Sequence, residues 1–335
     1  MNISSDGSGL VFNIVFTRNT FYYFRYLTRT FLQNSSVQVR IVLNGCSEPE
    51  QAEAINFVAE YEGRVFLAIA SNDKILPHHD SINMMLAEDE KSEYFCFADS
   101  DIFACDSFMH FFSGIKGSPG MICSGDTIWT EDNVVVEKNI ELWGRFYYDQ
   151  QGFTFGSSYF CIYNRMILNE IMEKYSVDFR RYAKEAIPKQ ALERVLDAGH
   201  DYSWYDTGKV LNILMVLEGY PIKHVPNCNL VHVGGMSWYL SLHRENYERM
   251  LAEEKKNSGK LGFLKRSKID PRLGISTDVL RLDFAEYAAQ VLICGVNAGS
   301  RGLPEIPKRL ARGEYGDKLR LLRSEMRRML ERQDL

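Results

Sequence analysis

Two aspartates close a short apolar and aromatic run in the segment EYFCFADSD, residues 93–101. Asp99 and Asp101 are separated by one serine, and a second apolar run begins directly after them. Neighbouring carboxylates repel each other and are costly to desolvate, so they persist beside a cation, in a hydrogen-bond network or in open solvent. A D-x-D tripeptide is also expected about once by chance in a chain of this acid content, as a solvated turn. The surrounding pattern therefore has to distinguish a cation site from a turn.

Short apolar runs alternate with helical patterns before and up to this tripeptide. The helical patterns are the spacing of Phe24, Leu27 and Phe31, a capping box that opens a helix at Ser47, and a third stretch over 77–90. The alternation predicts right-handed crossovers and a doubly wound, mostly parallel α/β sheet. The apolar runs are typical of buried strands: VFNIVFT (11–17), QVRIVLN (38–44), RVFLAIA (64–70) and EYFCFAD (93–99).

Polar residues follow the carboxyl end of each of these predicted strands. Ligands of parallel sheets bind in the crevice outside the carboxyl ends of the strands, so one polar ligand would account for all of them, although loops are commonly polar in any case. The sequence has no G-x-x-x-x-G-K-[ST], and no G-x-G-x-x-G follows the first strand, which disfavours P-loop and ordinary dinucleotide-binding chemistry. A D-x-D instead suits a divalent cation that bridges a diphosphate. The polar ends are Thr17-Arg18-Asn19, Asn44-Gly45-Cys46, Ser71-Asn72-Asp73-Lys74 and Asp99-Ser100-Asp101.

Length and composition describe a globular chain with a sizeable core. Of 335 residues, 45% are hydrophobic and 25% are charged, which excludes a disordered or fibrous protein. The net charge of −5 argues against a dedicated nucleic-acid binder, whose surface should be basic. Seven scattered cysteines without a C-x-x-C pair indicate reduced thiols and a cytoplasmic protein. No segment has the roughly 20 apolar residues of a membrane span, so a membrane-bound substrate would be reached from the surface.

The sequence from about Phe12 to Ser237 resembles the GT-A fold nucleotide-sugar glycosyltransferases, in particular the inverting enzymes of glycosyltransferase family 2. Matching segments are IVFTRN, VLNGCS (with Asn44 where aspartate is common), FADSDIFA and FGSSYFCIYNR. The most specific match covers residues 205–237, YDTGKVLNILMVLEGYPIKHVPNCNLVHVGGMS. Its first part, residues 205–218, is predicted to form an amphipathic helix. Its residues in register with the family are Asp206, Gly219, Tyr220, Pro226, His232, Gly234, Gly235 and Ser237. Tyr205 departs from the family, because it replaces the first acid of the usual pair.

The resemblance implies a fold, a reaction and roles for particular residues. The donor is a nucleoside-diphosphate sugar, the acceptor is a glycan or lipid-linked hydroxyl, and the cofactor is Mn²⁺ or Mg²⁺ bound by Asp101 and His232. Asp206, or less readily Asp201, is the general base of an inverting transfer. A role in polysaccharide biosynthesis is implied as well. The candidate nucleotide contacts are Thr17, Asn19, Asn44, Asp73, His79, Asp99 and Ser100.

Other interpretations of these residues stay open at the sequence level. His232 is also explained as an interior histidine, and Asp206 as an acid that favours a helix N-terminus. His224, Cys228 and His232 recur at intervals of four and could bind zinc. The aromatic run from Trp143 to Phe155 is either core or a platform for an acceptor sugar. Competing functions are a retaining GT-A transferase, a sugar nucleotidyltransferase, a glycoside hydrolase with paired carboxylates and a non-catalytic scaffold.

The chain is expected to divide into a GT-A domain and a C-terminal helical extension. The domain spans residues 1–245, with a nucleotide-binding half (1–105) and an acceptor half (106–245), and the extension spans 246–335. The last stretch, from Pro307, alternates leucine and methionine with arginine. A helix packed on the domain is the default interpretation, and docking on an anionic membrane surface or a partner helix is the functional one. The second would place the protein peripherally at the inner face of the membrane.

Overall fold

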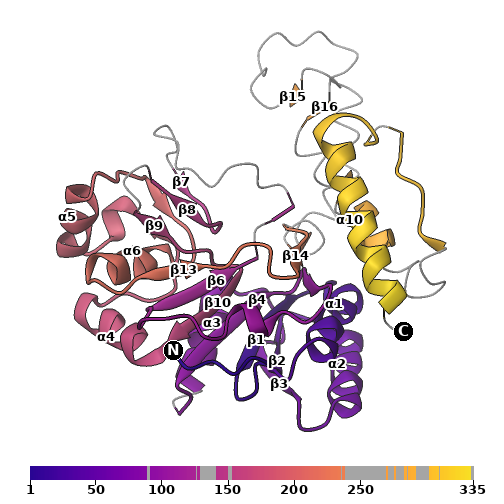
Figure 1. The fold of residues 1–335 in the computed structure, drawn as a ribbon, viewed down its shortest axis with the longest axis horizontal. Coiled ribbons are helices and arrows are strands. Elements are labelled where there is room, and N and C mark those ends of the chain that lie inside the picture. The colour runs from indigo at the N-terminus through magenta and orange to yellow at the C-terminus, as the bar shows by residue number, and fades with distance from the viewer. Residues whose placement is uncertain are drawn as a thin grey trace.

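A seven-stranded sheet forms the centre of the molecule (Figure 1). The computed structural model describes residues 1–88, 91–125, 127–128, 141–149, 153–234, 236–237, 269–270, 275–276, 283–284, 286–291, 302–308 and 310–332. The strand order is β13-β6-β10-β4-β1-β2-β3, and only β10 runs antiparallel to its neighbours. The predicted mostly parallel α/β sheet is thus confirmed. The strands are β1 (Val11–Thr17), β2 (Gln38–Asn44), β3 (Val65–Ser71), β4 (Tyr94–Asp99), β6 (Met121–Ser124), β10 (Phe160–Asn164) and β13 (Ile222–His224).

Helices cover both faces of this sheet, because each face carries its own apolar core. One core receives α1 (Phe21–Gln33) and α2 (Glu48–Glu60), and the other receives α3 (His78–Glu88), α4 (Arg165–Tyr175), α5 (Lys189–Asp197) and α6 (Lys209–Leu217). The capping box expected at Ser47 is present, with the Glu50 side chain accepting from the Ser47 backbone at 3.1 Å. The sheet is therefore doubly wound, as predicted.

Four small sheets and two 3₁₀ turns accompany the central sheet in the described residues. They pair β14 (Leu230–His232) with β5 (Ile102–Ala104), β8 (Tyr147–Tyr148) with β9 (Thr154–Phe155), and β15 (Ile269–Asp270) with β16 (Ile275–Ser276). A three-stranded sheet has the order β11 (Tyr182–Ala183), β12 (Trp204–Tyr205) and β7 (Glu141–Leu142). Two 3₁₀ turns, η1 (Met109–Phe111) and η2 (Lys184–Ala186), complete these connections.

The amphipathic helix expected over residues 205–218 is shorter and more buried than predicted. Tyr205 ends strand β12, and α6 begins only at Lys209. Gly208 has a φ of +73°, a left-handed conformation that side-chain-bearing residues rarely adopt, so the helix cannot extend back through it. Residues Lys209–Met215 are all buried. Asp206 consequently lies in the turn between β12 and α6 and not inside the helix.

The edge strand β3 also differs from its prediction as a fully buried strand. Phe66 and Ile69 are exposed there, since β3 has a neighbouring strand on only one side.

The cysteines behave as predicted in the part of the chain that the structure describes. Six of them are buried thiols.

The C-terminal stretch contains α10 (Gly313–Arg332), which stands beside the N-terminal half of the sheet in Figure 1. Its residues Leu319, Leu322, Met326 and Leu330 are buried in the same core as α1 and α2. The default interpretation of a helix packed on the domain is confirmed. The predicted boundary between residues 245 and 246 lies outside the described residues.

Candidate functional site

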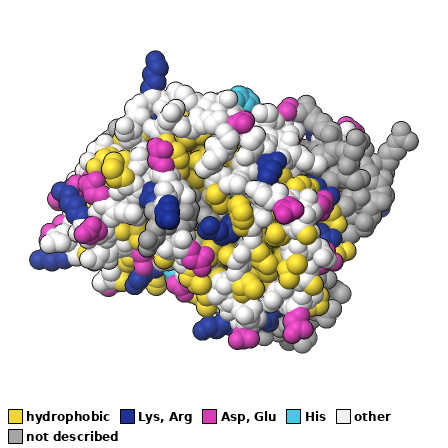
Figure 2. Space-filling view, turned by 90° about the horizontal axis from the view of Figure 1, so that it is seen from below, with side chains coloured by type: hydrophobic (Ala, Val, Ile, Leu, Met, Phe, Trp, Pro, Cys, Tyr) yellow, Lys and Arg dark blue, Asp and Glu magenta, His cyan; other side chains and the backbone are white. Residues whose placement is uncertain are grey.

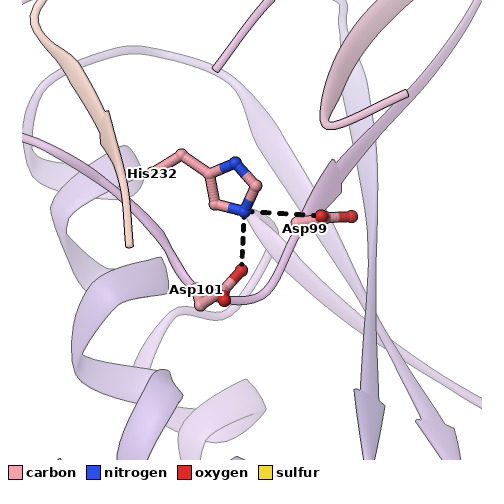
Figure 3. Close-up of side chains that lie close together, drawn as sticks. All are labelled: Asp99, Asp101 and His232. Atoms are coloured by element: carbon pink, nitrogen blue, oxygen red, sulfur yellow. Dashed lines mark hydrogen bonds and ion pairs between the residues drawn. The ribbon is translucent and has the colours of Figure 1, made fainter. Parts of the chain in front are cut away.

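Asp99, Asp101 and His232 converge at the carboxyl edge of the central sheet (Figure 3). His232 Nε2 lies 3.0 Å from Asp101 Oδ1 and 3.5 Å from Asp99 Oδ2. Asp99 ends β4, Asp101 precedes β5, and β14 pairs with β5 so that His232 stands opposite Ile102. The antiparallel pair β14-β5 therefore brings a histidine from late in the chain onto the D-x-D turn.

The segment directly after β14 holds the D-x-D turn by hydrogen bonds. Asp101 Oδ2 accepts from the Met236 backbone at 3.0 Å, and the Asp101 carbonyl accepts from the Val233 backbone at 3.0 Å. The Ser100 and Ser237 hydroxyls are 2.9 Å apart. With its backbone and one carboxylate oxygen fixed, Asp101 presents its second oxygen to His232.

The orientation of His232 leaves one ring nitrogen for a ligand. Nδ1 lies 2.7 Å from the Gly125 carbonyl, which can only accept a hydrogen bond, so Nδ1 carries a proton. In the neutral imidazole the lone pair is then on Nε2, the atom that faces both carboxylates. A backbone carbonyl on the other ring nitrogen is the usual arrangement of a metal-binding histidine.

The distances among these three side chains fit the coordination shell of a divalent cation. The three ligand atoms all lie within 4.8 Å of one another. Octahedral Mg²⁺ has ligands at 2.0–2.1 Å, so adjacent ligands stand about 3 Å apart and opposite ones about 4 Å apart. The measured 3.0 and 3.5 Å separations match adjacent positions. One imidazole and two carboxylates could hold such an ion and leave positions for phosphate oxygens or water.

The charges in this group depend on one another. Burial raises the pKa of Asp99 to about 8, with the Asp101 and Asp206 carboxylates acting in the same direction and His232 opposing them. Burial alone would also raise the pKa of Asp101, but the charge and hydrogen bond of His232 bring it below its ordinary value. Burial disfavours the charged imidazole, yet both aspartates raise the pKa of His232. A cation would replace the protons that these groups otherwise share.

Asp206 lies close enough to this group to affect its titration. Its charge contributes to the raised pKa of Asp99 and of Tyr159, whose ring packs against His232 at 4.5 Å between centroids. A Cβ added to Gly144 would stand 3.2 Å from Asp206 Oδ2 and 2.9 Å from Tyr159 Cε1. The Asp206 carboxylate and the Tyr159 ring thus both lie against the Gly144 backbone, in the surroundings of Asp99. Asp201, the other candidate base, is exposed and pairs with Lys184 at 2.5 Å.

The ends of β1, β2 and β3 are joined by Arg18. Its guanidinium donates to the Gly45 carbonyl at 2.8 Å and to the Asp73 carbonyl at 2.9 Å. Thr17 stands opposite Asn44 in the β1-β2 register. Asn19 has a φ of +67° in the turn that leads to α1. The structure thus brings four predicted nucleotide contacts, Thr17, Asn19, Asn44 and Asp73, to one edge of the sheet.

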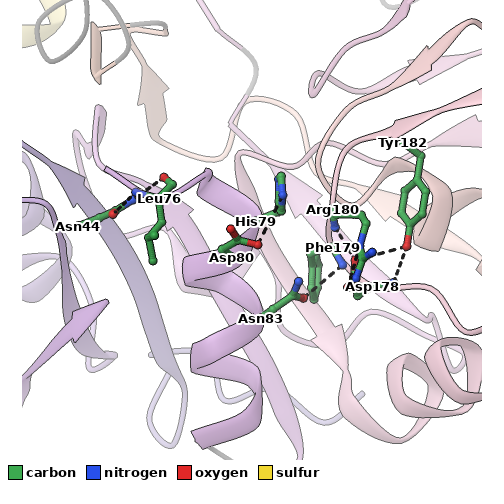
Figure 4. A network of polar contacts seen from close by, with 9 residues as sticks. All are labelled: Asn44, Leu76, His79, Asp80, Asn83, Asp178, Phe179, Arg180 and Tyr182. Carbon is green, nitrogen blue, oxygen red and sulfur yellow. Dashed lines mark hydrogen bonds and ion pairs between the residues drawn. The ribbon is translucent and has the colours of Figure 1, made fainter. Parts of the chain in front are cut away.

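Asn44 and His79 have partners of their own (Figure 4). The Asn44 amide accepts from the Leu76 backbone at 2.7 Å and donates to the Leu76 carbonyl at 2.9 Å, so it positions the loop before α3. His79 lies 3.6 Å from the Asp80 carboxylate. Direct contact of either side chain with a nucleotide stays a prediction.

Two residues that the sequence did not single out belong to these surroundings. Burial lowers the pKa of His78 to about 4, and the charges of Asp206 and Asp101 both oppose that shift, which places His78 near the acidic group. Lys209 is fully buried on the first turn of α6 and donates to the carbonyls of Arg145, at 2.6 Å, and Gly156. The sequence signal for Lys209 is a lysine inside an otherwise apolar helix, because lysine is rarely buried without partners.

The structure bears on two alternatives from the sequence, the zinc site and the aromatic run. The zinc interpretation is wrong, because its three side chains have separate partners: His224 stacks on Phe146, Cys228 lies 2.9 Å from the Ser124 hydroxyl, and His232 faces Asp101. Part of the aromatic run is core, and the platform interpretation stays a prediction for its exposed rings. Phe146, Tyr147 and Phe155 are buried, whereas Trp143 and Tyr148 are 54% and 41% exposed.

Comparisons with known proteins concern the fold. No protein-family model and no curated sequence matches this chain. The structure is similar to that of the mannosyltransferase PcManGT from Pyrobaculum calidifontis in complex with GDP-Man and Mn²⁺, with 11% identity, 98% of this chain and 88% of that chain covered, and a TM-score of 0.41. It is also similar to residues 1–349 of S. aureus TarS (12% identity, 96% and 90% covered, TM-score 0.38). A third is the galactosyltransferase LgtC in complex with donor and acceptor sugar analogs (13%, 68% and 87%, TM-score 0.35). Structural similarity at these TM-scores does not indicate which reaction this chain catalyses.

Proposed function

We propose that this protein is a metal-dependent glycosyltransferase that moves a sugar from a nucleoside diphosphate to an acceptor hydroxyl. The observation that carries the proposal is the convergence of Asp99, Asp101 and His232 at the carboxyl edge of the sheet, with a further carboxylate, Asp206, in the same surroundings. A cation site and a separate base are the two functions that this transfer requires.

The donor nucleotide is proposed to lie along the ends of β1, β2 and β4. Among the described residues, no hydrogen-bond partner is found for the buried Thr17 hydroxyl, a polar atom that a ligand would satisfy. Asp99 keeps a quarter of its side chain exposed although its surroundings desolvate it strongly, so this carboxylate lies in a recess that opens to solvent. These features support a bound polar ligand that extends from Thr17 to the D-x-D turn.

The metal is proposed to be Mn²⁺ in preference to Mg²⁺. Asp99, Asp101 and His232 would hold it, and imidazole suits transition ions better than it suits Mg²⁺. When bound, such an ion neutralises the charge that develops on a leaving diphosphate. The chain's own part is to fix the ligands, through Gly125 on His232 and Met236 on Asp101.

Asp206 is proposed as the general base of an inverting transfer. Its amide donates to the Leu142 carbonyl at 3.0 Å, and its Oδ1 accepts from the Thr207 amide at 2.8 Å, which leaves Oδ2 toward Gly144. That oxygen would take the proton of the attacking hydroxyl, and attack from the side opposite the diphosphate inverts the anomeric carbon. A glycan or lipid-linked acceptor, a role in polysaccharide biosynthesis and a cytoplasmic or peripheral location are parts of the same proposal.

Ligand-induced stabilisation tests the donor and the metal together. Thermal unfolding is measured with a panel of uridine, guanosine and thymidine diphosphate sugars, with and without Mn²⁺. One donor at about a hundred times its Kd should stabilise the native state by about 2.7 kcal/mol, and only with the metal present. Asp101→Asn should abolish this effect, whereas Asp197→Asn, an exposed carboxylate on α5, should retain it.

The products separate the competing reactions. Release of pyrophosphate would indicate a nucleotidyltransferase, retention of the anomeric configuration would remove Asp206 as the base, and turnover without metal or nucleotide would indicate a hydrolase. Stabilisation that ignores both Mn²⁺ and Asp101→Asn would contradict the metal site itself.

A further inference from the structure

Strand β3 ends the central sheet with an edge that no other strand of the described residues covers. It is the last strand in the order, and it pairs only with β2. Its sequence, VFLAIAS, contains no charged residue and no proline, the residues with which natural sheets usually protect an exposed edge. An apolar edge without this protection is a template for a further strand.

The backbone of β3 turns alternate residues toward this edge. The Val39 amide donates to the Arg64 carbonyl at 2.9 Å, and Val39 stands opposite Val65 in the parallel register. The residues that bond to a neighbouring parallel strand alternate along the chain, so Leu67 and Ile69 direct their amide and carbonyl groups away from β2. The register with β2 is regular up to Ile69 and shifts only beyond it. The segment 65–69 therefore presents a regular edge.

Three exposed apolar side chains border this edge. Phe66 and Ile69 in β3 are 39% and 44% exposed, and Ile55 in α2 is 57% exposed. Gln51, one turn before Ile55, donates to the Asn72 side chain at 3.3 Å directly after β3, so this flank of α2 lies beside the edge. Figure 2 views the molecule from below Figure 1, where β3 is the lowest strand of the sheet, and hydrophobic side chains gather on that face. Exposed apolar patches of this kind mark interaction surfaces.

The edge is apolar on both faces of the sheet. Val65 and Leu67 belong to the core that α2 covers, so Ile69, two residues further, lies on that face as well. Phe66 and Ala68 lie on the opposite face, where Ala68 packs against the other core. A strand added in the plane of the sheet would therefore meet apolar side chains both above and below.

A second copy of the same strand fits this edge. When two copies pair antiparallel with Leu67 opposite Leu67, the outward backbone groups of both residues exchange hydrogen bonds. Phe66 of one copy then stands opposite Ala68 of the other, so that a large ring meets a small side chain. On the other face, Val65 of one copy stands opposite Ile69 of the other. The strand is thus complementary to itself in size and in hydrogen bonding.

The helices α2 extend this contact beyond the strands. A two-fold axis perpendicular to the sheet keeps α2 of both copies on the same face, with the flank that carries Ile55 toward the other copy. A stable interface buries roughly 800 Å² on each partner, more than one short strand supplies, so the helix flank is a necessary part of it. A closed two-fold contact is the commonest arrangement of soluble oligomers, and it covers the edge of both copies at once.

We propose that this chain forms a two-fold homodimer in which the β3 strands of two copies pair antiparallel around Leu67 and join the two central sheets into one. Because the paired strands run in opposite directions, the carboxyl edges of the two sheets point in opposite directions, and so do the two candidate sites. The inference does not depend on which reaction these sites catalyse.

Sedimentation equilibrium of the full chain measures the association. Over about 1–100 μM, the wild type should contain dimer. Combining Ile55→Lys with Ile69→Lys sets like charges across the two-fold axis and should weaken association by at least about tenfold. Met166→Lys, at a 74% exposed position on α4, is the matched control and should associate as the wild type does. Urea unfolding of each form shows that it is folded.

Disulfide crosslinking tests the register of the two strands. In the proposed pairing, the Cα atoms of Phe66 and of Ala68 in the other copy lie about 4.5 Å apart, within the range of a disulfide. The same position in the two copies is about 7–8 Å apart, beyond that range. Phe66→Cys and Ala68→Cys proteins should therefore crosslink on mild oxidation when mixed, and neither should crosslink alone. Wild type oxidised in parallel controls for the native thiols.

Three results would overturn the proposal. A monomer at every concentration would refute the dimer and leave the edge to a different partner. A dimer that Ile55→Lys with Ile69→Lys does not weaken would use another surface. Crosslinking of Phe66→Cys or Ala68→Cys alone, without crosslinking in the mixture, would contradict the pairing around Leu67.

Discussion

At the scale of single residues, the site depends on carboxylates held in different protonation states. Burial and neighbouring acids favour a protonated Asp99, whereas His232 and the Met236 amide favour an ionised Asp101. Two carboxylates one residue apart are therefore not equivalent. Asp206 is a third carboxylate, placed in the turn after β12, beside the Gly144 backbone and near the Tyr159 ring.

Asp206→Asn tests the base at this scale. The amide keeps the shape of the side chain and can still accept from the Thr207 amide, but it cannot take a proton, so kcat should fall by about 10²–10⁴-fold. Initial rates at saturating donor and Mn²⁺ give this number. Asp201→Asn is the matched control, because Asp201 is exposed and pairs with Lys184, and its kcat should stay near that of the wild type. The reverse order of the two effects would make Asp201 the base.

At the scale of elements, α6 joins the two segments that surround Asp206. Lys209, in its first turn, donates to the carbonyls of Arg145 and Gly156, and Asn212, one turn later, donates to Gly156 at 3.3 Å. A cation near a helix N-terminus is opposed by the helix dipole, and burial adds to that penalty. Lys209 therefore acts as a clamp: its amine links the loops of Arg145 and Gly156 by hydrogen bonds, although the site disfavours its charged form.

The pH dependence of stability tests that clamp. Burial lowers the pKa of Lys209 to about 7, with Cys123, Asp206 and Cys161 opposing the shift and Arg145 adding to it. The unfolded chain then binds more protons between about pH 7 and 10.4, so this residue makes the native state more stable as pH rises through that window. Lys209→Met should remove that part of the slope and leave the Arg145 carbonyl without this donor, while Asn212 still donates to Gly156, so we expect a destabilisation of about 1–3 kcal/mol at pH 8.

Urea unfolding of both forms at pH 6, 7, 8 and 9 measures this difference. Lys189→Met, at an exposed position on α5, serves as the control and should follow the wild-type curve. A constant difference between wild type and Lys209→Met across the series would show that Lys209 stays charged when buried.

The helix α10 provides a second test at this scale. Leu322 is fully buried against the N-terminal core, whereas its neighbour Leu321 is half exposed. Leu322→Ala should lower the free energy of unfolding by about 2–5 kcal/mol, and Leu321→Ala should change it by less than about 0.5 kcal/mol. Chemical denaturation measures both. Equal effects would mean that α10 does not dock through its leucine face.

At the scale of the whole molecule, the surface mixes charges of both signs. Acidic and basic side chains are interspersed on the face shown in Figure 2, in keeping with a net charge of −5. Within the described residues, no helix combines the length and the apolarity that crossing a membrane requires. Leu319, Leu322, Met326 and Leu330 of α10 are buried in the core, and several of the exposed side chains that the structure describes on this helix are arginines.

Any membrane contact through α10 should therefore be electrostatic. Arg320, Arg327 and Arg328 are exposed, and each basic side chain near an anionic bilayer contributes about 1 kcal/mol. In sedimentation with lipid vesicles, we expect binding to phosphatidylglycerol-containing vesicles that declines with salt, and none to neutral phosphatidylcholine. Replacing the three arginines with glutamine should abolish it. Binding to neutral vesicles would instead require an apolar surface.

Local pattern was sufficient for strands β1 to β4 and for the helices between them. Strands β1 and β2 have the predicted bounds, and the capping box at Ser47 starts α2 as expected, because these elements follow from residue periodicity and hydrogen bonds within a few positions. The start of α6 was predicted four residues early, since the left-handed conformation of Gly208 is a property of the folded turn.

The order of short apolar runs was enough to predict the doubly wound sheet and the polar side chains at its carboxyl edge. Which of those side chains meet depends on how distant strands pair. The pairing of β14 with β5 puts His232 on the D-x-D turn, and the pairing of β12 with β7 puts Asp206 beside Leu142. These contacts join residues far apart in the chain, and no local periodicity encodes the register between such strands.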